Sequence, residues 1–262
     1  MDFSESQIQR YARHILLPEV GGVGQAKLLK ARVLAVGAGG LGSPLILYLA
    51  AAGVGTIGVI DHDNVDLSNL QRQVLHTTAR IGLPKVYSAQ AAVAAINPEV
   101  RLIPHRERLT AENAARLIAD YDIVADGSDN FATRFLVNDA CFFAKTTLVS
   151  AAVLRFDGQL ATFKPHAGSP CYRCLYPEEP AAGQIPTCAE AGILGAVAGV
   201  MGTLQATEVL KEILGIGEGL AGRLMIYDAL GATSRVVKVN RDPACALCGT
   251  APTIADLSGH RR

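Results

Sequence analysis

The sequence predicts an α/β protein built on a Rossmann-like, doubly wound sheet that is extended by a mixed or antiparallel C-terminal half. Three observations predict this class. Strands alternate with helices over the first 150 residues, the strands are continuous apolar runs, and the pattern changes after about residue 150. Continuous apolar strands that alternate with helices are typical of a parallel sheet covered on both faces. We expect the 262 residues to form a single domain.

The first half, about 1–150, is the expected nucleotide-binding half. Its helix at 85–96 should end before Asn97-Pro98, because the residue before a proline disfavours helical backbone. From the N-terminus we expect helices at 4–13, 43–52, 85–96, 111–119 and 131–144, and strands at 33–37, 57–61, 100–104, 122–125 and 147–153.

The second half, about 151–250, departs from this alternation. Asp157-Gly158 lies between two apolar runs and predicts a β-hairpin. A long helix at 191–214 follows, and then strands around 223–227 and 234–239. We expect residues 251–262 to form a flexible tail.

The composition limits the possible partners. The formal net charge is zero, which gives no electrostatic reason to expect nucleic acid or an anionic membrane as a partner. The first ten residues are polar, unlike a signal peptide, and the longest apolar run, 191–204, is too short to cross a bilayer. We therefore expect a cytoplasmic protein whose cysteines bind metal or react rather than form disulfides.

The stretch VLAVGAGGLGSPL, at 33–45, has the pattern of a phosphate-binding turn between a strand and a helix. Gly37 permits the tight turn, Gly39 lets the backbone approach phosphate, and Gly42 lets the helix pack closely on the strand. Asp61, at the end of the next strand, is spaced to accept ribose hydroxyls. These features favour a nucleotide, but they do not choose between NAD, FAD and ATP.

Two cations follow the acidic residue. Arg72 lies in the polar segment DHDNVDLSNLQRQVLH, and Lys85 starts the next helix behind Pro84. Each alone is more typical of a solvated surface. Together, near a ribose site, they suit a triphosphate better than the two phosphates of a dinucleotide.

Acidic and amide side chains end another strand, in ADGSDNFATR. Asp126, Asp129 and Asn130 there lie at the carboxyl edge of the predicted parallel sheet, where ligands bind. Asp129 could hold Mg²⁺, which prefers carboxylate and phosphate oxygen. The same residues could instead cap the helix that starts near Phe131, and both readings hold if Asn130 caps and Asp129 points at the nucleotide.

Two Cys-x-x-Cys pairs, CYRC and CALC, predict a closed four-sulfur zinc site, hence a structural one. The ligands would be Cys171, Cys174, Cys245 and Cys248. Two redox pairs are the alternative, but neither pair starts a helix directly after a strand as a thioredoxin-type motif does.

The remaining cysteines and the histidines carry weaker signals. Cys188 precedes the long helix, and either a nucleophilic thiol or an inert small residue fits that position. Cys141 lies in an apolar helix and is expected in the core. The six histidines show no metal spacing, and we assign them no chemistry.

Taken together, the motifs resemble one enzyme family. GAGGLGSP, DLSNLQRQ with the following PK, CYRC, GVMGTLQATEVLK and CALCG are similar to the bacterial adenylyltransferases that activate ubiquitin-like sulfur carriers (the MoeB, ThiF and HesA group). These resemble the catalytic core of ubiquitin-activating enzymes. The resemblance covers nearly the whole chain and implies a homodimer that adenylates the C-terminal glycine of a small ubiquitin-like protein with ATP and Mg²⁺.

The resemblance also implies roles for single residues. Arg13, in RYARHILL, resembles an arginine that reaches into the partner subunit's nucleotide site, and the four paired cysteines resemble structural zinc ligands. The implied catalytic set is Arg13, Arg72, Lys85 and Asp129, with Cys188 as a further candidate. The implied nucleotide-binding set is Gly37, Gly39, Gly40, Gly42, Asp61, Ser68, Asn69, Leu70, Gln71, Arg72, Lys85, Asp129 and Asn130.

The tail YDALGATSRVVKVNRDPACALCG resembles the molybdopterin branch more than the thiamine branch. The expected carrier is therefore the small subunit of molybdopterin synthase, bound by the second half of the chain. In the thiamine branch a cysteine placed like Cys188 takes part in sulfur transfer. We expect no appended rhodanese domain. An NAD-dependent oxidoreductase explains only the glycines and Asp61, and a non-catalytic carrier-binding scaffold does not explain the cations and Asp129.

Overall fold

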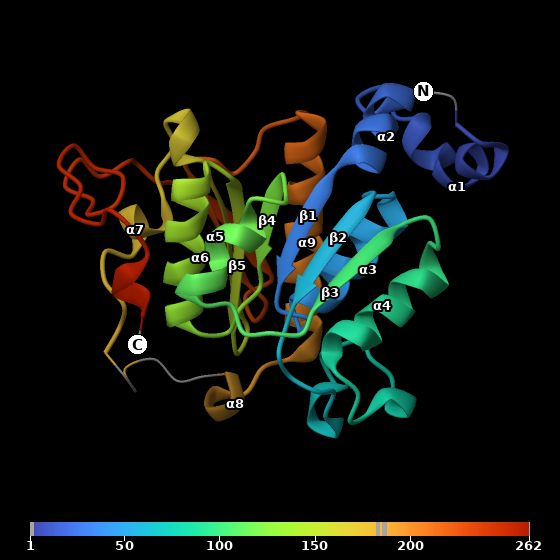
Figure 1. Cartoon of the computed structure of the whole chain (residues 1–262), viewed down its shortest axis with the longest axis horizontal. Helices are drawn as coiled ribbons and strands as arrows, with labels where there is room; N and C mark the ends of the chain where they lie inside the picture. Colours follow the sequence, from blue (N-terminus) through green and yellow to red (C-terminus); the bar gives the residue numbers. More distant parts are fainter. Residues whose placement is uncertain (1–2, 182–183, 185–187, 262) are drawn as a thin grey trace.

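An eight-stranded mixed sheet with helices on both faces organises the chain (Figure 1). The computed structural model describes residues 3–181, 184 and 188–261, without the side chains of residues 188 and 189. The strand order is β3-β2-β1-β4-β5-β6-β7-β8. The strands are β1 (Arg32–Val36), β2 (Thr56–Ile60), β3 (Arg101–His105), β4 (Ile123–Asp126), β5 (Thr147–Leu154), β6 (Asp157–Phe163), β7 (Arg223–Asp228) and β8 (Thr233–Lys238).

The sheet changes direction at β5. Strands β3, β2, β1, β4 and β5 pair in parallel, and β5 to β8 pair antiparallel. The first five are joined by helices, whereas β5 and β6 are joined by a two-residue turn, which can connect only antiparallel strands. The predicted fold class, a doubly wound half extended by an antiparallel half, is confirmed.

Helices cover the two faces in separate groups. Helices α2, α3, α4 and α9 pack on one face and α5, α6 and α7 on the other, and each group closes an apolar core layer against the sheet. The helices are α1 (Glu5–Ile15), α2 (Gly21–Lys30), α3 (Gly42–Ala52), α4 (Lys85–Ile96), α5 (Ala111–Ile118), α6 (Phe131–Ala144), α7 (Tyr172–Leu175), α8 (Cys188–Ala191) and α9 (Gly195–Leu214).

Helix α2 was not expected from the sequence. Its segment GGVGQAKLLK contains three glycines, which disfavour helix formation. Packing overrides this preference. A Cβ added at Gly24 would meet the side chain of Leu214 at 3.0 Å, and buried Gln25 donates to the backbone carbonyl of Ala52 at 2.9 Å.

The hairpin was predicted, but its turn was misplaced. Leu154 pairs with Asp157, so the turn consists of Arg155 and Phe156, and Asp157-Gly158 belongs to β6. Arg155 adopts the left-handed conformation that this tight turn requires, with φ of 55°. Gly158 is needed for another reason, because a side chain there would overlap Met201 of α9.

The predicted helix at 191–214 begins later than expected, at Gly195, and ends at Leu214 as predicted. Helix α8 ends at Ala191, Gly192 has a φ of 77°, and α9 begins at Gly195. A left-handed residue cannot continue a right-handed helix, so the break follows from Gly192. Gly195 in turn lies so close to the backbone of Gln71 that a side chain there would overlap it.

The C-terminal segment also differs from expectation. We predicted a flexible tail for 251–262, but residues 251–261 pack against the body of the protein. Ile254 contacts the four-cysteine cluster, Leu257 contacts the core layer under α6, and His260 contacts buried Asp139 at 2.8 Å. The His260 contact joins residues 121 positions apart in the sequence, and no local pattern indicates it.

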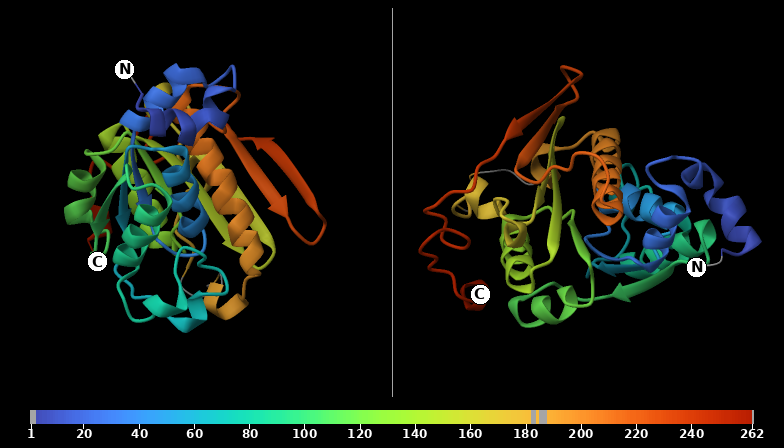
Figure 2. Two further views of the ribbon diagram at one scale, coloured as in Figure 1. Left: turned by 90° about the vertical axis from the view of Figure 1, so that its right-hand side faces the viewer. Right: turned by 90° about the horizontal axis from the view of Figure 1, so that it is seen from above.

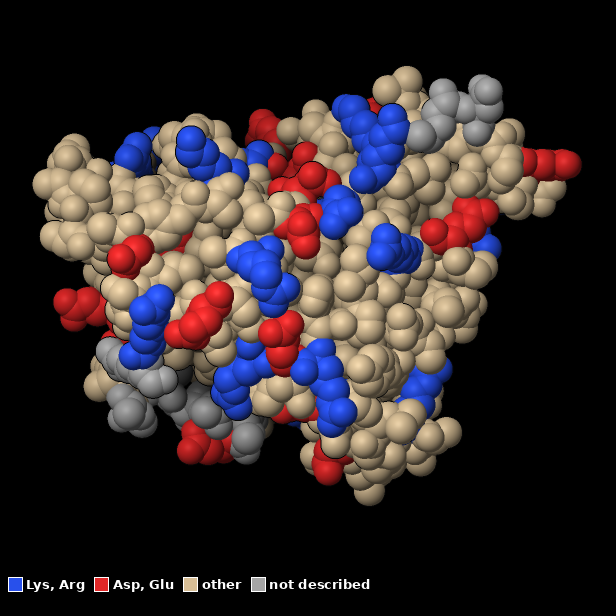
Figure 3. Space-filling view, in the orientation of Figure 1, with Lys and Arg blue, Asp and Glu red and all other residues tan. Residues whose placement is uncertain are grey.

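The surface carries charges of both signs. Basic and acidic side chains are interspersed over the face seen in Figure 3, in keeping with the net charge of zero. The β7–β8 hairpin extends away from the body of the molecule (Figure 2), and every residue of β8 is exposed. Among the described residues, no helix combines the length and the hydropathy that a membrane span requires.

Candidate functional site

The glycine turn lies where the sheet order reverses, between β1 and β4. Gly37 follows β1 with a φ of 92°, and a Cβ added to it would lie 3.4 Å from the carbonyl oxygen of Gly127, which follows β4. A Cβ at Gly42 would lie 2.9 Å from the carbonyl carbon of Gly37 and closer still to its oxygen. Glycine at these positions therefore closes the turn and directs the N-terminus of α3 toward it, an arrangement suited to an anion.

Asp61 braces this turn from the neighbouring strand. Its Oδ2 accepts the backbone N–H of Ala38 at 2.8 Å, and its Oδ1 accepts the N–H of Asp63 at 2.9 Å. The carboxylate remains partly exposed to the adjoining cavity. A carboxylate at the end of β2 is the position where a ribose is bound in this class of sheet.

His76 also contacts the glycine turn, at the backbone of Ala38, and the sequence did not indicate this role. Its Nε2 lies 2.9 Å from the carbonyl oxygen of Ala38 and its Nδ1 lies 2.8 Å from Oγ of Ser88. A carbonyl can only accept, so Nε2 donates and Nδ1 accepts in the neutral ring. Burial lowers the pKa of His76 below its ordinary value and favours this neutral form.

The two predicted cations reach the site from different elements. Lys85, at the start of α4, is buried, and its Nζ lies 2.9 Å from Oδ2 of Asp63. Burial acts to raise the pKa of Asp63, but the hydrogen bond and charge of Lys85 lower it below its ordinary value. Arg72 donates to the backbone carbonyl of Ser68 at 3.0 Å. Within the described part of the chain, no carboxylate pairs with Arg72.

Asn130 and Asp129 lie side by side at the start of α6, and their side chains face different surroundings. The Asn130 side chain caps α6 by accepting the backbone N–H of Thr133 at 2.9 Å, while exposed Asp129 lines the cavity. Asp129 contacts only the Asn130 amide, at 3.4 Å, among the described side chains. The carboxylates of Asp61 and Asp63 are already engaged, so Asp129 is the acid best placed to take a cation with phosphate oxygens as its other ligands.

A buried ion pair between Asp126 and Arg134 lies next to the site, and the sequence did not indicate it. Asp126, at the end of β4, accepts from Ser150 Oγ at 2.9 Å and lies 3.4 Å from Nη1 of Arg134. Arg134, one turn into α6, also donates to the backbone carbonyl of Ser128. An acid at a strand end and an arginine eight residues later could have suggested this pair.

These elements enclose one cavity of about 490 Å³. It brings together eight predicted residues: Gly37, Gly39, Gly40, Asp61, Arg72, Lys85, Asp129 and Asn130. Gly42 lies behind the turn, and Ser68, Asn69, Leu70 and Gln71 form the adjoining segment without lining the cavity. Arg13 is exposed on α1, away from the cavity, and the side chain of Cys188 lies outside the described residues.

The far end of the cavity is formed by residues that sequence reasoning missed. Tyr172 and Tyr176 come from the α7 region and Gln159 from β6, and the Tyr176 hydroxyl donates to Gln159 Oε1 at 2.6 Å. Burial raises the pKa of Tyr176, which keeps its hydroxyl protonated and able to donate. Glu107 and Arg108, which follow β3, line the opposite edge. Their position after a parallel strand is the one signal that could have indicated them.

The four paired cysteines come together at one point. Their sulfur atoms lie 3.6 Å apart between Cys171 and Cys245, 3.4 Å between Cys174 and Cys248, and 4.0 Å between Cys171 and Cys174. Zinc–sulfur bonds of about 2.3 Å in a tetrahedron place the sulfur atoms about 3.8 Å apart. The donor set and spacing therefore fit zinc, and all four cysteines are free of disulfides.

Comparisons with known proteins identify the family of this chain. The ThiF family model matches residues 11–247. The chain is 49% identical over 261 residues to the sulfur carrier protein adenylyltransferase of Thermus thermophilus, covering 98% of this chain and 96% of that protein. The chain belongs to the ThiF family. It is also 47% identical over 249 residues to the SAMP-activating enzyme E1 of Haloferax volcanii, covering 95% of this chain and 92% of that enzyme.

Other relatives of this ThiF-family chain are longer than it is. It is 50% identical over 258 residues to the bovine (Bos taurus) adenylyltransferase and sulfurtransferase MOCS3, covering 98% of this chain but only 56% of that protein. The crystal structure of E. coli MccB with succinimide superposes with a TM-score of 0.80 at 22% identity, covering 95% of this chain and 75% of that one. That likeness confirms the fold, and the curated relatives confirm the predicted enzyme class, an adenylyltransferase.

Proposed function

We propose that this ThiF-family protein uses ATP to adenylate the C-terminal glycine of a small ubiquitin-like sulfur carrier. The observation that carries the proposal is the meeting of the glycine turn, Asp61, Arg72, Lys85 and Asp129 in one cavity. A dinucleotide oxidoreductase would use the turn and Asp61, but it would leave two cations and an acid at the phosphate end without a task. The name of the Thermus relative supports a sulfur carrier as the second substrate.

The chemistry demands cations at this position. The glycine carboxylate attacks the α-phosphorus of ATP, a P–O bond to the carboxylate forms, and the bond to pyrophosphate breaks. Two anions must approach one another, and negative charge accumulates on the departing pyrophosphate. Positioning and stabilisation of that charge supply most of the catalysis in such transfers. We assign that work to Arg72 and Lys85, with Lys85 held in place by Asp63 at 2.9 Å.

Magnesium and a second subunit complete the proposed site. Asp129 would hold Mg²⁺, which supplies charge neutralisation at the phosphates. Arg13, exposed on α1, would enter the site of a partner subunit in a homodimer. Exposed apolar side chains close to it in sequence, Leu16 and Leu17, support burial of this region against a second copy.

The carrier is the finer part of the proposal. We propose the small subunit of molybdopterin synthase, bound by residues 151–250 of the single domain, because the C-terminal sequence resembles that branch. The alternative is the thiamine-pathway carrier, with Cys188 taking part in sulfur transfer. Adenylation is common to both, so the choice of carrier and the role of Cys188 are separate questions from the reaction.

ATP–pyrophosphate exchange with purified carriers tests the proposal. Exchange should depend on a carrier, and the molybdopterin-type carrier should support it better than the thiamine-type carrier. Arg72→Ala should lower exchange by about 10²–10³-fold, the usual loss when one charge-stabilising donor is removed. Arg101→Ala, an exposed arginine outside the cavity, is the matched control and should keep full activity. Normal exchange by a folded Arg72→Ala protein would exclude the assignment.

A further inference from the structure

The C-terminal segment 253–261 bridges the two halves of the zinc site and helix α6. At one end, the backbone N–H groups of Thr253 and Ile254 donate to the carbonyl oxygen of Ala246, at 2.8 and 2.9 Å. Ala246 lies between the ligands Cys245 and Cys248, so this end of the segment is tied to the second cysteine pair. Ile254 also packs against the cluster.

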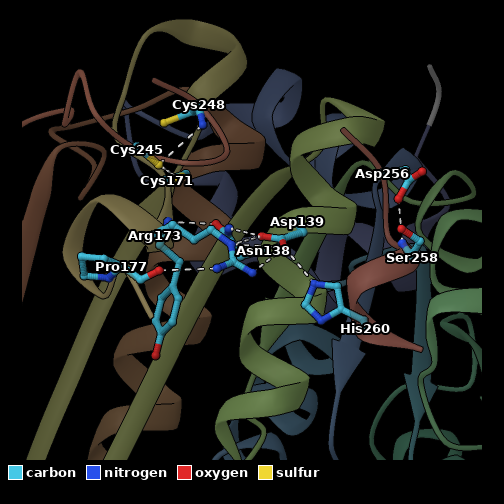
Figure 4. Close-up of polar contacts among 11 residues, drawn as sticks. Asn138, Asp139, Cys171, Arg173, Pro177, Cys245, Cys248, Asp256, Ser258 and His260 are labelled. Carbon is cyan, nitrogen blue, oxygen red and sulfur yellow. Dashed lines mark hydrogen bonds and ion pairs between the residues drawn. The ribbon is translucent and has the colours of Figure 1, made fainter. Parts of the chain in front are cut away.

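At its other end, the segment reaches the first cysteine pair through a buried carboxylate. His260 Nε2 lies 2.8 Å from Oδ2 of Asp139, a fully buried residue of α6 (Figure 4). Arg173, the residue between Cys171 and Cys174, grips the same carboxylate with two nitrogens, from Nε to Oδ1 and from Nη2 to Oδ2, both at 2.8 Å. Two nitrogens on two oxygens form the most directional kind of ion pair.

The neighbouring residue strengthens the grip on the first pair. Asn138 Nδ2 donates to Asp139 at 2.9 Å, and Asn138 Oδ1 accepts the backbone N–H of Tyr172 at 2.8 Å. Burial acts to raise the pKa of Asp139, but the hydrogen bonds from His260 and Arg173 lower it below its ordinary value, which keeps the carboxylate charged. Helix α6 therefore binds the segment between Cys171 and Cys174, which is here called the first knuckle, through the backbone of Tyr172 and the side chain of Arg173.

Between its two attachments the segment does not fill the space beneath it. A cavity of about 350 Å³ lies there, lined by Asp139, Arg173 and the segment itself. The segment is held at its ends by Ala246 and Asp139, and between them by Leu257, which packs against the core layer under α6. Loss of the His260 attachment should loosen the segment without removing a large part of the core.

We propose that residues 253–261 act as a latch that retains zinc, with His260 as the residue that closes it. The closed latch ties each cysteine pair to the other through Asp139 and Ala246, so the four sulfur atoms stay together. His260 is a positioning residue, since it acts on the knuckle through Asp139 and touches no ligand. The first knuckle also carries Tyr172 and precedes Tyr176, which both line the large cavity, so the latch supports that wall as well.

Zinc release from the full-length protein tests the latch. Zinc is measured with a colorimetric chelator in wild type, His260→Ala, His260→Gln and the control His166→Ala, whose histidine is exposed on another loop. We expect release from His260→Ala to be on the order of tenfold faster, the lower end of the loss of metal affinity when a supporting contact outside the ligands is removed. His260→Gln keeps an N–H donor and should restore most of the retention.

Hydrogen exchange gives a second readout that does not depend on zinc release. The amides of Thr253 and Ile254 should exchange faster in His260→Ala than in wild type, whereas those of β1 should be unchanged. Asp139 keeps its two bonds to Arg173 in this variant, so the protein should remain folded. Wild-type zinc release from a folded His260→Ala protein, or unchanged exchange at 253–254, would overturn the proposal.

Discussion

Two single substitutions in the glycine turn, Gly42→Ala and Gly39→Ala, should have different effects, the first on folding and the second on ATP binding. At Gly42 an added Cβ would lie 2.9 Å from the Gly37 carbonyl carbon and closer to its oxygen, inside the 3.0 Å below which such contacts essentially do not occur. At Gly39 it would meet only Nε2 of Gln73, at an ordinary 3.7 Å. Gly42→Ala therefore perturbs the fold, and Gly39→Ala perturbs only what enters the cavity.

The magnitudes follow from these contacts. Overpacking costs about 1–3 kcal/mol, and we expect about 3 kcal/mol for Gly42→Ala because the atoms met are backbone and cannot rotate away. In a chain of this size that is a fall in Tm of roughly 6–12 °C. Gly39→Ala should change the free energy of unfolding by less than about 0.5 kcal/mol. It should weaken ATP binding at least about tenfold, or about 1.4 kcal/mol, because the methyl group occupies the phosphate side of the turn.

Thermal unfolding and calorimetric titration with ATP measure the two effects on the same samples. Gly168→Ala is no suitable control because its φ is 87°, whereas Gly199→Ala, in α9 with open space around it, is a matched one. A wild-type Tm for Gly42→Ala would refute the turn geometry. Wild-type ATP affinity for Gly39→Ala would refute the placement of the phosphates.

Three further predictions concern other residues. The pKa of His76 is lowered in the folded protein, so its contribution to stability is present above its ordinary value of 6.5 and is lost as pH falls from 6.5 through the folded pKa. Denaturant titrations should show that, as pH falls through that window, the free energy of unfolding of the wild type decreases by at most about 1.4 kcal/mol per pH unit more than that of His76→Gln; the same pH dependence in both proteins would contradict this. Arg134→Leu leaves Asp126 buried without its cation and should lower the free energy of unfolding by about 3 kcal/mol, measured by urea denaturation; a loss below about 1 kcal/mol would show that the hydrogen bonds from Ser150 Oγ and the Ser128 N–H suffice to support the carboxylate. Cys188→Ser should leave ATP–pyrophosphate exchange unchanged because adenylation needs no thiol, and a large loss would assign the thiol a part in the first step.

Local signals predicted the first half of the fold well. Helices α4 and α6 begin and end where the sequence indicates, because Pro84 and Asn130 mark their starts. Helix α2 could not be predicted, since its glycines disfavour a helix and its stability comes from contacts with Leu214, far along the chain. The turn at Arg155 was misplaced because a left-handed arginine has no sequence signature, whereas Asp-Gly has one.

The candidate site likewise has one part that the sequence indicated and one part that it did not. Its phosphate end is built from contiguous motifs, and the sequence indicated Gly37, Asp61 and Lys85. Its far wall is built from α7 and β6, which the fold brings together, so Tyr176 and Gln159 had no local pattern. His76 was assigned no role because its partner, the carbonyl oxygen of Ala38, is a backbone atom 38 residues away.

The most direct test of the central claim is the mass of the carrier after reaction. A purified ubiquitin-like carrier is incubated with this protein, ATP and Mg²⁺, beside a carrier that lacks its terminal glycine. We predict that intact carrier gains AMP at its C-terminal carboxylate, that the shortened carrier gains none, and that NAD does not replace ATP. An unmodified intact carrier under conditions where the protein binds ATP would contradict the account.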